Sequence, residues 1–85
     1  MKVIKRDGRF EDYDISKIKR TICNASDDIN KPLTEGDLKN LGDLIDHSIR
    51  ESFSESVPSN EIRNIIESTL RENGFSAVAS SYTNS

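Results

Sequence analysis

The sequence has few of the residues that form disulfides, metal centres and membrane spans. Its 85 residues include one cysteine, Cys23, and one histidine, His47. A single thiol cannot form an internal disulfide, and no group of cysteine and histidine has the spacing of a zinc site. No apolar run is long enough to cross a bilayer, and no apolar signal segment begins the chain. We therefore expect a cytoplasmic protein with no membrane contact and no metal site.

Motifs for catalysis are also missing. The sequence has no nucleophile paired with a base and no Walker-type phosphate loop. Cys23 lies beside an apolar stripe with no base near it, so we interpret it as an inert, packed thiol. His47 falls away from the apolar positions of its segment, which favours a solvated side chain over a ligand or a catalytic group. We expect no catalysis within these residues, although they could belong to a longer enzyme.

The charged residues are distributed unevenly. The net charge is −3, but residues 1–20 contain seven basic and four acidic residues, whereas residues 21–85 contain five basic and eleven acidic ones. A basic pole on an acidic body favours a local anionic ligand. It does not favour nucleic acid, which needs a larger basic face.

Residues 2–14 are predicted to form a β-hairpin. Asp7 and Gly8 are the signal for a two-residue turn, because both tolerate the positive φ angles that such a turn needs. Val3 precedes the turn and Phe10 follows it, as expected of strand residues. An isolated hairpin is barely stable in water, so this one should rest on the apolar surface of the helices that follow.

Basic residues surround the predicted turn and the start of the first helix. They are Lys5, Arg6, Arg9 and Lys17. Asp14 is in position to cap that helix, because its carboxylate can accept hydrogen bonds from N–H groups of the first turn. Lys17 opposes the helix dipole in the same turn unless an anion is bound nearby. A basic hairpin that leads into a helix N-terminus is a candidate site for a polyphosphate.

Apolar residues at helical spacing predict four helices, with approximate bounds of 15–29, 34–54, 59–73 and 76–83. Thr34 and Asp37 form a capping-box pattern, and Ser59 and Ser76 are expected to cap the third and fourth helices. The apolar face of the second helix consists of Leu38, Leu41, Leu44, Ile45, Ile49 and Phe53. The predicted fold is α+β and mostly helical: a single domain, residues 1–85, with a four-helix bundle capped by a small N-terminal β-hairpin or sheet.

Two stretches of the chain form a pattern that is typical of a known family. The first consists of Val3, Lys5-Arg6-Asp7-Gly8, Phe10 to Tyr13, Asp14 and Lys17-Ile18. The second consists of Val57 to Ile62, Leu70, and Val78 to Tyr82. Together they resemble the ATP-cone domain, a nucleotide-sensing module at the N-terminus of many ribonucleotide reductases and in a bacterial repressor of their synthesis. The resemblance covers nearly the whole chain.

The resemblance implies that ATP or dATP binds as an effector, with Mg²⁺ able to accompany the triphosphate, in a cleft between hairpin and bundle. The site residues that it implies are Val3, Lys5, Arg6, Glu11, Asp14, Lys17, Ile18, Ser59 and Arg63. Glu11 would accept a hydrogen bond from the adenine amino group, which guanine cannot offer at that place. Lys17 would reach the phosphates, and Ile18 would pack on the base.

Some positions depart from the family pattern. Asp14 lies where the family often has asparagine, and Ser59 lies where some members have threonine near the phosphates. Arg63 lies where some members have a histidine that contacts phosphate. Many members follow the closing tyrosine with an aromatic and basic residues, whereas here the chain continues from Tyr82 with Thr-Asn-Ser. The resemblance therefore does not carry over a phosphate contact from the last helix.

The function that the resemblance implies is allosteric. The domain would sense the ATP/dATP ratio and control the overall activity of a ribonucleotide reductase, an oxidoreductase, with the catalytic domain of that enzyme as partner and nucleotide-dependent oligomerisation as a further expectation. Its start near Met1 favours a large reductase subunit, such as the anaerobic ribonucleoside-triphosphate reductase. The residues also leave open a small helical DNA-binding or protein-interaction module of a nucleotide-responsive transcriptional regulator.

Overall fold

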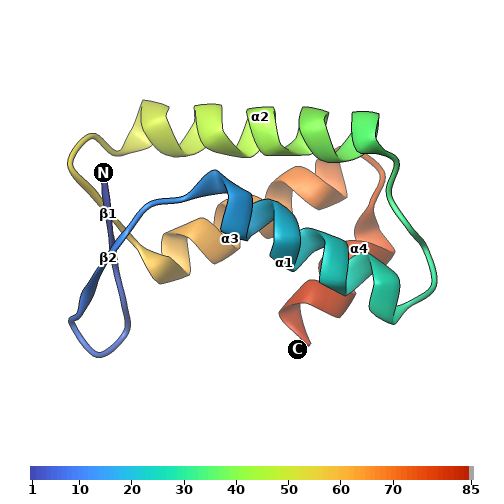
Figure 1. The fold of residues 1–85 in the computed structure, drawn as a ribbon, viewed down its shortest axis with the longest axis horizontal. Helices are drawn as coiled ribbons and strands as arrows, with labels where there is room; N and C mark the ends of the chain where they lie inside the picture. Colours follow the sequence, from blue (N-terminus) through green and yellow to red (C-terminus); the bar gives the residue numbers. More distant parts are fainter. Residues whose placement is uncertain (85) are drawn as a thin grey trace.

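Four helices and a small sheet make up the computed structural model, which describes residues 1–84 (Figure 1). The elements, in chain order, are β1 (Lys2–Ile4), β2 (Phe10–Asp12), α1 (Ile15–Asp28), α2 (Glu35–Ser52), β3 (Ser56–Pro58), α3 (Ser59–Glu72) and α4 (Ser76–Thr83). The predicted α+β, mostly helical fold is confirmed. Each helix begins and ends within two residues of the range that its apolar pattern indicated.

The hairpin closes with a longer loop than the sequence suggested. β1 and β2 pair antiparallel, and the Lys5 N–H donates to the Arg9 carbonyl at 2.8 Å. Three residues therefore separate the last paired positions, and the predicted two-residue turn was wrong. Gly8 has a φ of 89°, while Asp7 keeps a negative φ. A three-residue loop needs a left-handed residue at one position only, and glycine supplies it.

A third strand joins the hairpin. β3 pairs parallel with β1, so the strand order is β2-β1-β3. No strand was predicted between the helices expected at 34–54 and 59–73. Pro58 cannot donate a ladder hydrogen bond, which argues against a strand, but it lies on an edge strand, where no donor is needed. Because β3 leads directly into α3, this pairing places the first turn of α3 beside the end of β1.

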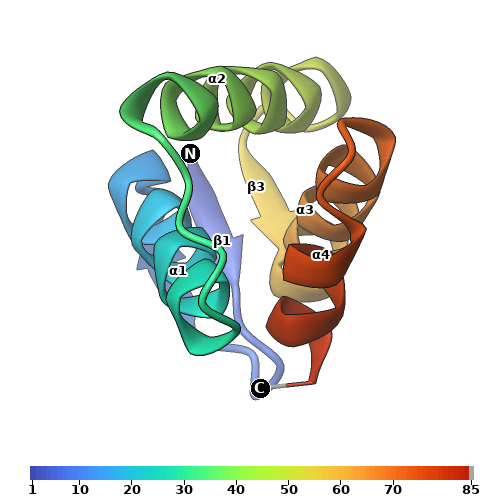
Figure 2. The same cartoon turned by 90° about the vertical axis from the view of Figure 1, so that its right-hand side faces the viewer.

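The helices enclose one apolar core under the sheet. Figure 2 shows α1 on one side, α3 and α4 on the other, α2 across the top, and β1 and β3 between the two sides. The core consists of Ile18, Ile22, Ala25, Leu41, Ile45, Ile49, Val57, Ile62, Ile66, Leu70, Val78, Ala79 and Tyr82. Leu44 was expected on the buried face of α2 but is 40% exposed. The inward face of α2 is narrow, with residues spaced by four, and Leu44 lies outside it.

Two of the predicted helix caps form as expected. The Ser16 N–H donates to the Asp14 carboxylate at 2.9 Å at the start of α1. At the start of α2, the Asp37 N–H donates to the Thr34 hydroxyl at 3.0 Å, and the Thr34 N–H donates back to the Asp37 carboxylate at 3.4 Å. These caps satisfy N–H groups that have no partner inside the helix.

Two other predicted caps do not form. Ser59 and Ser76 are the first residues inside α3 and α4, and the cap positions are taken by Pro58 and Phe75, which make no side-chain cap hydrogen bond. Proline has a fixed φ close to that of a helix, so the chain can turn from β3 into α3 at Pro58. Ser59 is therefore one position too far along to accept from the first-turn N–H groups, and its hydroxyl remains available to the neighbouring cavity.

Candidate functional site

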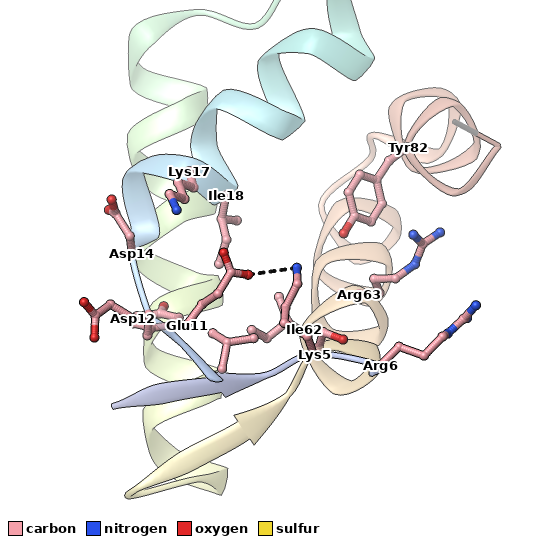
Figure 3. Close-up of a pocket in the computed structure, with 13 residues that line it drawn as sticks. Lys5, Arg6, Glu11, Asp12, Asp14, Lys17, Ile18, Ile62, Arg63 and Tyr82 are labelled. Carbon is pink, nitrogen blue, oxygen red and sulfur yellow. Dashed lines mark ion pairs between the residues drawn. The ribbon is translucent and has the colours of Figure 1, made fainter. Parts of the chain in front are cut away.

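A cavity of about 480 Å³ lies between the hairpin and helices α1, α3 and α4 (Figure 3). All nine site residues named in the sequence analysis line it, from Val3 on β1 to Arg63 on α3. Asp12, Tyr13, Ile62 and Tyr82 complete the lining. The fold thus brings together residues that lie more than forty positions apart in the sequence. Whether each of them contacts a ligand remains a prediction.

One part of the cavity wall is apolar. Ile18 from α1, Ile62 from α3 and Tyr82 from α4 each expose less than a tenth of their surface, and Val3 from β1 is half-buried. Small-molecule sites commonly combine such a wall with a few polar groups. Ile62 and Tyr82 were not among the site residues that the resemblance implied. Both residues do pack in the core, so their apolar spacing gave no sign that they also face the cavity.

An ion pair crosses the cavity between the two hairpin strands. Val3 lies opposite Glu11, and Lys5, one residue beyond the end of β1, points to the same face of the sheet. The Lys5 Nζ lies 3.0 Å from a Glu11 carboxylate oxygen. The hydrogen bond and the charge of Lys5 hold the pKa of Glu11 below its usual value, and Lys17 and Arg9 act in the same direction. Glu11 is therefore an anionic acceptor at neutral pH.

The cavity has two ends with different chemistry. In Figure 3, Asp14 and Lys17 lie on the same side as Glu11, whereas Arg6 and Arg63 extend toward the opposite side. One end thus offers carboxylate acceptors beside a single lysine. The other end is basic.

The basic end continues into a second hollow. This hollow has a volume of about 430 Å³ and shares Lys5, Arg6, Ser59 and Arg63 with the first cavity. It also includes the first turn of α3, where backbone N–H groups and the helix dipole favour an anion. The Arg63 guanidinium lies 5.5 Å from the centre of the Tyr82 ring. This cation–π distance keeps the charge of Arg63 over the cavity wall.

A comparison with known protein families agrees with this geometry. The family model of the ATP cone domain matches residues 1–84. The chain belongs to the ATP cone family. Domains of this family are nucleotide-binding regulatory modules, and ATP and dATP are their effectors. A search of curated proteins found no match to this cone.

Tyr13, which lines the cavity between β2 and α1, contacts side chains of α2. The Tyr13 hydroxyl donates to the Asp46 carboxylate at 2.7 Å, and Arg50 Nε donates to both oxygens of the same carboxylate at 3.1 and 3.2 Å. The Arg50 guanidinium also lies 5.4 Å from the centre of the Tyr13 ring. Burial and the Asp46 carboxylate raise the pKa of Tyr13 well above its usual value. No sequence signal links Tyr13 to a partner 33 residues away, which is why this contact was not predicted.

The acidic residue at the outer rim of the cavity has a partner on the neighbouring strand. Asp12 forms an ion pair with Lys2, and this cation lowers the pKa of Asp12. The two residues are opposite each other in the β1–β2 ladder. Lys2 is not part of the cavity lining, so this pair neutralises the Asp12 carboxylate without using a cation that lines the cavity.

The residues considered for metal binding or catalysis lie outside the cavity. His47 is on the exposed side of α2, 3.5 Å from Glu51, and Cys23 is a half-buried free thiol on α1. Within residues 1–84, no three or more His, Cys, Asp and Glu side chains are placed to hold a metal ion. No helix in this part of the chain is long and apolar enough to cross a membrane.

Proposed function

We propose that this cone is the allosteric ATP- and dATP-binding domain of a ribonucleotide reductase. The observation that supports it is the convergence of four cations, an anionic acceptor and an apolar wall on one cavity. The cations are Lys5, Arg6, Lys17 and Arg63. They line a hollow and do not form an outward basic face, which favours a small polyanion over DNA.

The two ends of the cavity give the nucleotide a direction. The base lies at the Glu11 end, where the carboxylate accepts a hydrogen bond from the adenine amino group and Ile18 packs on the ring. The phosphate chain runs toward Arg6, Arg63 and the first turn of α3, and Ser59 adds a hydroxyl there. The reverse direction would place the phosphates against Glu11 and Asp14, and like charges repel.

Lys5 and Lys17 lie between these ends. Lys5 extends from the middle of the cavity, so it can reach the phosphates once it leaves Glu11. Lys17 lies on the Glu11 side, so the phosphate nearest the ribose is the one in its reach. Mg²⁺ would arrive with the triphosphate, because this ion usually keeps phosphate and water ligands and needs few protein carboxylates.

The proposed regulatory role depends on how the effects of ATP and dATP on the protein can differ. ATP and dATP differ by one hydroxyl group, so a large difference in affinity is not expected. They regulate only if each favours a different arrangement of the parent protein. We therefore propose that the cone passes its nucleotide state to the catalytic domain of the reductase through nucleotide-dependent oligomerisation, in the cytoplasm.

Calorimetric titration of the domain with ATP, dATP and GTP tests the proposed function. ATP and dATP should bind, and GTP should bind at least about tenfold more weakly, because its oxygen at the corresponding position cannot donate to Glu11 and repels it. Binding of GTP as tight as that of ATP would remove Glu11 from base recognition. The absence of heat with ATP and dATP at millimolar concentration would overturn the proposed function.

A further inference from the structure

The Lys5–Glu11 ion pair joins the two residues that the proposed function assigns to opposite parts of the nucleotide. The Lys5 Nζ is 3.0 Å from the Glu11 carboxylate, and the dashed line in Figure 3 shows this contact across the cavity. About 40% of each side chain is exposed, so solvent and ligand can reach both groups. The pair thus lies where a nucleotide would have to bind.

A bound nucleotide has to separate this pair. The amino group of adenine and the phosphate chain lie at opposite ends of the ligand, with the ribose between them. A lysine and a carboxylate in direct contact cannot serve both ends at once. On binding, Lys5 exchanges the carboxylate for phosphate, and Glu11 exchanges the ammonium group for the adenine amino group. Each charged group then keeps a hydrogen-bonding partner.

We propose that the Lys5–Glu11 pair restricts the site to ligands that carry both an amino-bearing base and a phosphate chain. This inference rests on the proposed function and adds a selection rule to it. Free polyphosphate gives Lys5 a partner but leaves Glu11 unpaired beside further negative charge. A nucleoside gives Glu11 a partner but leaves Lys5 without an anion. A nucleotide replaces both halves of the pair, so inorganic polyphosphate and free nucleosides compete poorly.

The surroundings of the pair are consistent with this exchange. Lys17 lies near enough to Glu11 to affect its ionisation, so the carboxylate keeps a cation in its neighbourhood when Lys5 leaves. Arg6 forms no ion pair with any residue of 1–84, so it can bind phosphate without first leaving a carboxylate. Among the cations that line the cavity, Lys5 is the one whose partner must be displaced.

The test uses fragments of the nucleotide on variants that each lack one half of the pair. Adenosine and inorganic tripolyphosphate are titrated separately, with affinities read from amide chemical shifts in NMR spectra, which also report whether each variant is folded. Lys5→Met frees Glu11 and should tighten adenosine binding about two- to fivefold, the range that exposed ion pairs support. Glu11→Gln frees Lys5 and should tighten tripolyphosphate binding by a similar factor. Both variants should bind ATP more weakly than the wild type.

Two controls separate release of a partner from a simple change of charge. Adenosine is neutral, so the loss of a lysine charge alone does not improve its binding. Asp12→Asn removes a carboxylate from the same cavity without freeing one of its lining cations, and it should tighten tripolyphosphate binding less than Glu11→Gln does. If wild-type protein binds ATP but Lys5→Met does not tighten adenosine binding, the selection rule is wrong and the proposed function stands. If wild-type protein binds neither ATP nor dATP, both are wrong.

Discussion

Arg6 lies in the hairpin loop and Arg9 pairs with Lys5 where the loop closes, but the two arginines have different surroundings. Arg9 Nε donates to the Asp7 carboxylate at 2.7 Å, and its backbone N–H donates to the same carboxylate at 3.2 Å. Arg6 lines both hollows of the site, whereas Arg9 lines neither. Two residues with equal charge and similar sequence position therefore have different expected roles. Arg6 belongs to the Lys-Arg-Asp-Gly motif and Arg9 directly follows it, so sequence position alone does not show this difference.

Replacing each arginine in turn tests the assignment. Arg6→Ala should weaken ATP binding about three- to tenfold, because it removes a charge-assisted contact to phosphate in a partly exposed site. Arg9→Ala is the matched control and should change the affinity by less than about twofold, since its charge lies outside the cavity and is screened at physiological salt. Calorimetry at constant ionic strength measures both. Equal losses in the two variants would indicate general electrostatic attraction and no direct contact of Arg6.

At the scale of elements, the position of the hairpin depends on contacts that are distant in sequence. The β2–α1 corner is held by Tyr13 on Asp46 of α2, and the other side of β1 is held by β3. These contacts keep the strand residues facing the helices. The cavity therefore depends on both the Tyr13–Asp46 contact and the β1–β3 pairing. A hairpin attached at one side only could move away from α1 or α3.

The contact between Tyr13 and α2 can be measured as stability. Asp46→Ala should lower the free energy of unfolding by about 1–2 kcal/mol, because it removes the acceptor of a partly buried hydroxyl and of Arg50. Asp43→Ala, on the same helix, breaks only an exposed pair with Lys39 and should cost at most about 0.5 kcal/mol. Urea denaturation measures both values. A loss for Asp46→Ala no larger than that for Asp43→Ala would show that the contact does not hold the corner.

The sequence predicted correctly those features that depend on residues close together in the chain. The Asp14 cap, the Thr34–Asp37 capping box and the helix ranges each depend on neighbouring residues, and they appear close to their expected places. β3 could not be predicted in this way. It has three residues, ends in Pro58, and pairs with a strand more than fifty positions earlier in the chain. The Ser59 cap was predicted wrongly for the same reason, because β3 moves the cap position to Pro58.

At the scale of the whole molecule, the site depends on a fold that only part of the sequence signals. The basic hairpin and Lys17 suggested an anion site from composition alone, and the family resemblance added Ser59 and Arg63. Neither signal indicated that Tyr82 forms part of the wall or that Lys5 and Glu11 are paired with each other. Both features depend on how the strands and helices pack against each other, so local sequence does not reveal them.

A nucleotide in this cavity would touch β1, β2, α1 and α3 at once, so it should stabilise the whole domain. At a free concentration about 100-fold above the dissociation constant, a ligand adds about 2.7 kcal/mol to the free energy of unfolding. In a domain of this size each kcal/mol raises the melting temperature by about 4–8 °C, so a rise of about 10–20 °C is expected. Because ATP and dATP differ by one hydroxyl group, their effects on the isolated domain should agree within about 3 °C. Differential scanning calorimetry measures this.

The difference between the two nucleotides should instead appear in the assembly of the parent protein. If the cone acts by population shift, ATP and dATP stabilise the domain equally but favour different arrangements of the reductase, and small-angle scattering profiles of the full-length protein will differ between them. A melting temperature that responds to only one nucleotide would place the discrimination inside the cavity. Identical scattering profiles with the two nucleotides, at concentrations that saturate the cone, would contradict the proposed switch because no population would have moved.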